Sequence, residues 1–131
     1  MATRKDRHDA RVQAVAGLGK VLSRRAGSRC ELCSGDQDLR VIEVPPVDED
    51  PHVEAALLSC GPCLERHGAK HPARDADALR FLETAAWADP VPVKLMAIRW
   101  LRRLSDAGVD WATEILDGLW VPEEVQELLD S

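Results

Sequence analysis

Cys30-Glu-Leu-Cys33 and Cys60-Gly-Pro-Cys63 are the two stretches that decide this fold, and 26 residues separate them. A Cys-x-x-Cys turn directs two sulfurs toward one ion, and two such turns complete a tetrahedral shell of four thiolates. The spacing therefore predicts that Cys30, Cys33, Cys60 and Cys63 bind one metal ion together. Zn²⁺ is the expected ion, although iron also accepts four thiolates and the sequence does not separate the two. A closed four-cysteine shell offers no position for water or substrate, so we expect the zinc to be structural.

The residues beside each cysteine pair suit such turns. Gly35 follows the first pair, and a glycine can take the left-handed backbone conformation that a tight metal-binding turn often requires. Pro62 suits the first turn of a helix running toward Gly68, which would place Cys60 near a helix N-terminus, where the dipole favours a thiolate. Because structural zinc contributes roughly 10–16 kcal/mol and its binding is coupled to folding, we expect chelation to disorder residues 28–66.

The second cysteine pair also suggests an enzyme, since thioredoxin carries the tetrapeptide Cys-Gly-Pro-Cys at its active site. The alternative function is therefore a thiol oxidoreductase that uses Cys60 and Cys63. Ser59 stands where thioredoxin has a tryptophan, however, and the residues that follow have a helical pattern instead of the strands that such a fold needs. In a reducing compartment, paired Cys-x-x-Cys motifs are better explained by a shared metal than by disulfides.

A second enzymatic alternative is a degenerate nuclease of the HNH type, a class that often uses the same paired cysteine scaffold. His67, four residues after Cys63, occupies a position where such an enzyme could keep a metal-binding histidine. The catalytic base is missing, because the first predicted strand ends in Val41-Ile-Glu-Val-Pro45 without a histidine. We therefore interpret His67 as a surface residue or a neighbour of the metal ligands. The remaining histidines have less claim to catalysis: His8, His52 and His71.

Helical and strand patterns surround the cysteines. Apolar residues from Val12 to Leu22 recur every three or four positions and predict a helix that ends near Gly27. We expect this helix to dock on the later helices and the first ten residues to be frayed. β-Branched residues predict strands over 39–44 and 52–59, which an acidic, proline-rich loop joins into a hairpin.

The second half of the chain has helical periodicity. One helix is predicted to begin near Asp75 and to include Ala86. The clearest amphipathic pattern follows from Val93 and ends at Gly108. Shorter helices are predicted after Asp110 and from Pro122. Four tryptophans fall in or beside these apolar stripes, and we expect them to pack in the core: Trp87, Trp100, Trp111 and Trp120.

The predicted fold is one domain over residues 1–131, mainly α with a small zinc-binding β-hairpin. It would comprise a basic N-terminal helix (1–27), a zinc-binding lobe (28–70) and a helical lobe (71–131). We expect a lobe of the zinc-ribbon or treble-clef kind, packed against a helical bundle. Three arginines of the strongest helix are expected to form a solvated face: Arg99, Arg102 and Arg103.

Charge is distributed unevenly along the chain. Residues 1–29 hold eight basic and two acidic residues and carry a net charge of +6, whereas the remainder holds nine basic and 21 acidic residues and carries −12. The acidic body disfavours a broad phosphate-binding face, because affinity for nucleic acid depends largely on basic residues. Nucleic-acid binding through the basic N-terminal helix is the remaining alternative. We expect no secretory signal, no membrane span and a cytoplasmic location.

Several motifs, taken in order, resemble the PhnA-like family, which is named for an alkylphosphonate operon. They are Ser28-Arg-Cys-Glu-Leu-Cys33, Val41-Ile-Glu-Val-Pro-Pro46, the second cysteine pair, Pro92-Val-Lys-Leu-Met-Ala-Ile-Arg-Trp-Leu-Arg-Arg-Leu104 and Leu116-Asp-Gly-Leu-Trp-Val-Pro-Glu-Glu124. The resemblance implies a zinc-ribbon-type lobe with the four cysteines as ligands. Proteins of that family commonly continue into a small C-terminal β domain that these residues do not include.

The expected function is that of a small structural-zinc protein that acts as a binding or regulatory module. Its partner would be another protein of unknown identity. The sequence contains no nucleophile–base pair and no open metal site that would cleave a carbon–phosphorus bond. An enzyme is therefore the less favoured class.

Overall fold

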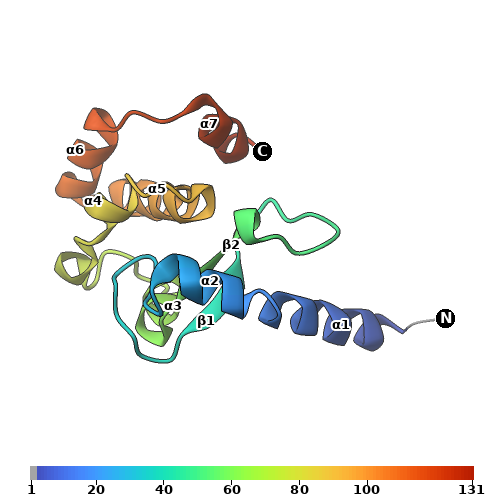
Figure 1. The fold of residues 1–131 in the computed structure, drawn as a ribbon. Helices are drawn as coiled ribbons and strands as arrows, with labels where there is room; N and C mark the ends of the chain where they lie inside the picture. The colour runs from blue at the N-terminus through green and yellow to red at the C-terminus, as the bar shows by residue number, and fades with distance from the viewer. Residues whose placement is uncertain (1–2) are drawn as a thin grey trace.

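Helices dominate residues 3–131, the part of the chain that the computed structural model describes, and one antiparallel hairpin accompanies them (Figure 1). This confirms a mainly helical chain with a small hairpin. The elements in chain order are α1 (Arg4–Ala16), α2 (Gly19–Ala26), β1 (Arg40–Glu43), the 3₁₀ turn η1 (Val53–Ala55), β2 (Ala56–Ser59), α3 (Gly61–His67), the 3₁₀ turn η2 (Ala76–Leu79), α4 (Leu82–Ala85), α5 (Val91–Asp106), α6 (Asp110–Gly118) and α7 (Glu123–Leu129).

The hairpin joins the two cysteine pairs. β1 and β2 are antiparallel, with Val41 opposite Leu58 and Ile42 opposite Leu57. All four residues of β2 are buried, so this strand is part of the core. The second strand is shorter than predicted, because residues 53–55 form the turn η1 and only Ala56 starts the extended segment.

The N-terminal helix is two helices, and the first begins earlier than predicted. Thr3 caps α1, where its hydroxyl accepts from the Asp6 N–H and the Asp6 carboxylate accepts from the Thr3 N–H. This capping box explains why the expected fraying is wrong from residue 4 onward. The break between α1 and α2 falls at Gly17 and Leu18, where glycine lowers helix propensity. The predicted end is confirmed, since Gly27 has a left-handed φ of 65°.

The N-terminal helices pack mainly on the hairpin, so the expectation that they dock on the later helices is wrong. Leu22 of α2 is fully buried and forms a small core with Ala56 and Leu58. Arg25 secures this contact, because its guanidinium donates to both carboxylate oxygens of Glu31 at 2.8 Å and to two main-chain carbonyls beside η1. The bidentate pair and the apolar cluster together hold α2 to the hairpin.

The helical lobe is built around α5. Nine residues of this helix are buried, and α4, α6 and α7 pack against it. Its last turn is followed by Gly108, whose φ of 90° suits glycine and ends the helix where predicted. The helix expected from Asp75 to Ala86 is instead split into η2 and α4. Within residues 3–131 no helix combines the length and the apolar character that a membrane crossing needs.

The tryptophans do not share one role. Trp100 is fully buried at the centre of α5, and Trp111 is partly buried against the same core. Trp87 and Trp120 keep 54% and 71% of their surface exposed, so the prediction of core packing is wrong for these two. Periodicity places both rings beside an apolar stripe, but α4 and α6 end before either ring is covered.

Two arginines of α5 connect the lobes instead of facing solvent only. Arg103 donates to the main-chain carbonyl of His67 at 2.6 Å, and Arg99 donates to the carbonyls of Pro45 and Leu128. The expected solvated face therefore holds for Arg102, which is exposed, but is wrong for the other two. Hydrogen bonds from charged donors are stronger than neutral ones, and these contacts fix α5 to the loop after β1, to the end of α3 and to α7.

Candidate metal centre

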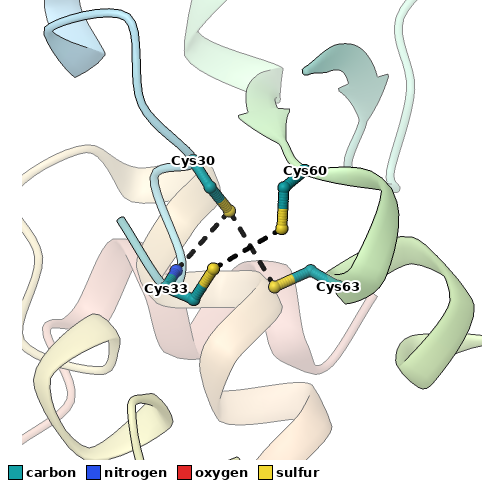
Figure 2. A group of neighbouring side chains, drawn as sticks. All are labelled: Cys30, Cys33, Cys60 and Cys63. Atoms are coloured by element: carbon teal, nitrogen blue, oxygen red, sulfur yellow. Dashed lines mark hydrogen bonds between the residues drawn. The ribbon is translucent and has the colours of Figure 1, made fainter. Parts of the chain in front are cut away.

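Four cysteine sulfurs meet at the junction of the two lobes. Figure 2 shows the side chains of Cys30 and Cys33 converging with those of Cys60 and Cys63. All four sulfurs lie within 4.8 Å of one another, and two sulfur–sulfur contacts run between the motifs. Cys30 Sγ is 3.9 Å from Cys63 Sγ, and Cys33 Sγ is 3.5 Å from Cys60 Sγ. The sulfurs are close enough to hold a metal ion.

The first pair sits on a tight turn that directs backbone N–H groups at sulfur. The N–H groups of Leu32 and Cys33 point at Cys30 Sγ at 3.4 and 3.5 Å, and that of Gly35 points at Cys33 Sγ at 3.4 Å. Such donors stabilise thiolate charge. The left-handed residue is Ser34, with φ of 69°, and not Gly35 as predicted. A side chain at position 35 would be crowded, because a Cβ there would lie 3.3 Å from Cys33 Sγ.

The second pair begins a helix, as predicted. Cys60 is the N-cap of α3, Pro62 occupies its first turn, and Cys63 follows within that turn. Gly61 has no room for a side chain, since a Cβ would lie 2.8 Å from Asp38 Oδ2. The short strand β2 and the helix α3 therefore position these two sulfurs rigidly beside the first pair.

Burial and mutual hydrogen bonding shape the acidity of the thiols. Cys30, Cys60 and Cys63 are at most 3% exposed, and Cys33 is partly buried. The hydrogen bond between Cys30 and Cys63 lowers the pKa of Cys30 to about 4 and raises the pKa of Cys63. Burial raises the pKa of Cys60. Because a metal site of this kind needs all four sulfurs as thiolates, metal binding should release protons and depend on pH.

His67 lies near the cysteines in sequence, but its side chain packs against Trp100 and does not join the cysteine cluster. Its ring makes an edge-to-face contact with Trp100, with ring centroids 5.2 Å apart. Among residues 3–131, only the four cysteines form a group of three or more side chains placed to share a metal ion. His67 is therefore not brought into such a group. His8, His52 and His71 are exposed.

Burial should make His67 a weaker base than an ordinary histidine. Desolvation first, and then the charge of Arg103, lowers the pKa of His67 below 6.5. The unfolded chain binds this proton at a higher pH than the native protein, so the stability contribution is present above pH 6.5 and decreases as the pH falls through that value. Titration of the imidazole resonances by NMR should give His67 a midpoint below the ordinary histidine pKa of about 6.5. A His67 midpoint above that value would contradict the packing described here.

Two further features of the structure could not be predicted from the sequence. Asp38, for which Gly61 makes room, and the orphaned ring nitrogen of Trp100 give no signal in a single sequence. The four cysteines themselves are all found by their spacing. No family model matches this sequence, and neither the curated proteins nor the solved structures yield a significant match to it.

Proposed function

We propose that the four thiolates bind one structural Zn²⁺ ion and that the chain acts as a zinc-stapled binding module. The observation that carries the proposal is the convergence of four sulfurs within 4.8 Å, three of them on cysteines that are nearly inaccessible to solvent. A set of four sulfur donors suits zinc, and the N–H groups aimed at two of the sulfurs suit bound thiolates. The ion would fix the turn at Cys30 and helix α3 to each other.

A structural role is favoured over catalysis by the surroundings of the cluster. Four protein ligands leave no coordination position for substrate, and the ring of His67 is packed against Trp100 instead of lining an open site. The resemblance to the PhnA-like family supports the same zinc-ribbon interpretation. A reducing compartment such as the cytoplasm would keep the thiols available for the metal.

The thiol oxidoreductase alternative is disfavoured by access and by pairing. A catalytic thiolate must reach the disulfide of its substrate, but Cys60 and Cys63 are 2% and 1% exposed. Both sulfurs also make hydrogen-bond contacts with the first motif, Cys60 with Cys33 and Cys63 with Cys30. This arrangement suits a shared ion better than a reversible Cys60–Cys63 disulfide.

Two assays on the zinc-loaded protein separate the module from the enzymes. We expect no nicking of supercoiled plasmid with added Mg²⁺ or Mn²⁺, and no reduction of insulin disulfides above a buffer control. Nicking that His67→Ala abolishes and His71→Ala preserves would establish a nuclease instead. Insulin reduction that Cys60→Ser abolishes in a protein with an unchanged circular dichroism spectrum would establish an oxidoreductase.

A further inference from the structure

We propose that the groove between α1 and the hairpin is the docking surface of this module, and that its occupant is an amphipathic helix of a partner protein with acidic flanks. The inference rests on the proposed function, because it identifies the surface through which the module binds. Figure 1 shows α1 extending from the hairpin away from the helical lobe.

The groove has an apolar lining that is covered only in part. Its volume is about 910 Å³, and residues from α1, α2 and both strands line it. The apolar lining combines Val12 and Val15 of α1 with Leu39, Val41 and the buried Leu58. None of the residues of α1 is buried, and Val12 is 53% exposed. A helix of 13 residues is marginal in water without a packed face, so the apolar side of α1 calls for a covering partner.

A polar clamp holds the groove open in the absence of that partner. Arg11 donates to both carboxylate oxygens of Glu43, at 2.6 and 3.0 Å, and to the carbonyls of Asp48 and Glu49 at 2.9 and 2.7 Å. These four bonds attach α1 to β1 and to the acidic loop. They involve polar groups only, so they do not cover the apolar side chains of the groove. The surface is therefore formed before the partner arrives, which reduces the ordering cost of binding.

The shape of the floor fits a helix. α1 contributes Val12, Val15 and Ala16 to the groove, at helical spacings of three and four, and Gly19 at the start of α2 continues the lining. The small residues Ala16 and Gly19 allow a second helix to approach closely, while the two valines supply a ridge. Since α1 is about 20 Å long at 1.5 Å per residue, the groove accommodates an amphipathic helix of three to four turns.

The charge on the rim selects an acidic occupant. Three arginines and a histidine line the groove with a single carboxylate: Arg7, His8, Arg11, Arg40 and Glu43. Arg11 is paired with Glu43, and Arg40 makes an exposed ion pair with Asp38, so among the described lining residues Arg7 is the arginine without an ion pair. Exposed pairs such as Arg40 with Asp38 contribute little and can exchange for a carboxylate of the partner. A second copy that brought its own α1 to this face would set like charges against each other, which costs affinity. Nucleic acid would match the arginines but would leave the apolar floor exposed to water. An acidic amphipathic helix satisfies both features.

The test selects peptides on the full-length, zinc-loaded protein. The probe is a displayed library of helical peptides of about 14 residues, with each position drawn from glutamate, lysine, leucine and alanine. We expect enriched peptides to carry a leucine stripe and a net negative charge. Their affinity, measured by fluorescence anisotropy, should fall about tenfold or more with Val12→Asp. It should fall also with Arg7→Glu and with added salt. Val21→Asp is the matched control, because Val21 is 51% exposed on α2 and lies outside the groove.

Three results would overturn the proposal. The first is a selection that enriches nothing beyond what the Val12→Asp protein enriches, or that enriches basic peptides. The second is light scattering that shows a dimer which Val12→Asp dissociates, since the occupant would then be a second copy. The third is binding of a single-stranded oligonucleotide that Arg7→Glu abolishes and Val12→Asp leaves intact. Elemental analysis of the same samples keeps the proposed function separate, since zinc-loaded, folded protein without peptide binding refutes the docking surface alone.

Discussion

Removal of the metal from the native protein is expected to disorder residues 28–66 while α5 keeps part of its helical structure. Leu32, Val44 and the strand β2 contribute to the buried core, but the ion would link all four thiolates of the lobe at once. Structural zinc is worth about 10–16 kcal/mol in small zinc domains, which exceeds the stability of most domains. Loss of the ion should therefore unfold the lobe and not merely loosen it.

Elemental analysis and hydrogen exchange measure this result. Native protein should contain one zinc per chain, and a chelator should abolish amide protection at Leu57 and Leu58 before it affects Leu101. Re-addition of zinc should restore protection, because the thiols stay reduced. Cys30→Ser and Cys63→Ser should reproduce the effect, whereas Arg29→Gln, an exposed neighbour of the first pair, should not. Full protection in chelated protein, or a chain purified with iron in place of zinc, would contradict the proposal.

Replacement of Trp100 by alanine should lower the free energy of unfolding by about 3–5 kcal/mol. Trp100 is fully buried, and its ring makes edge-to-face contacts with His67 and Phe81 at centroid distances of 5.2 and 5.8 Å. The substitution would leave a large cavity between α5, α3 and the segment before α4. The loss of packing there should destabilise both lobes, because His67 is the last residue of α3, the helix that carries Cys63.

Urea unfolding in a zinc buffer measures the change. Trp120→Ala is the matched control, because Trp120 is 71% exposed and should shift stability by no more than about 0.5 kcal/mol. Trp100→Phe should cost less than Trp100→Ala. Among residues 3–131 the buried indole N–H of Trp100 has no hydrogen-bond partner, so phenylalanine removes an unsatisfied donor while it keeps most of the ring. Equal losses for Trp100→Ala and Trp120→Ala would refute the described core.

The two predictions act on opposite sides of the same junction. The cysteine cluster holds the hairpin to α3 from one side, and Trp100 supports the end of α3 from the other through His67. Arg103 adds a third link, from α5 to the main chain at His67. Damage at any of these points should therefore change the position of α1 and α2, and with it the groove that we assign to a partner.

Local chemistry explains which features were predictable from sequence. Each Cys-x-x-Cys turn, the helix start at Pro62, the helix ends at Gly27 and Gly108 and the strong helix around Trp100 depend on neighbours within a few residues. Turn geometry, fixed proline φ angles and the 3.6-residue period act over that range. These features could be predicted without knowledge of the partners in space.

Long-range packing decided the rest. Whether Trp87 and Trp120 are covered depends on where α4 and α6 end relative to α5, and their sequence stripes do not encode that. The same applies to Arg99 and Arg103, whose acceptors lie 54 and 36 residues away along the chain.

The N-terminal helix illustrates the division most clearly. Its amphipathic pattern by itself predicted that the residues from Val12 to Leu22 would be helical and would carry an apolar stripe, although not that the helix begins at Arg4 or breaks before Gly19. Only the tertiary structure decided that Leu22 is buried on the hairpin while Val12 remains exposed over a groove. The reason is that an apolar stripe indicates which side chains favour burial but not which surface covers them. That surface is determined by contacts between residues distant in sequence, such as Arg11 with Glu43.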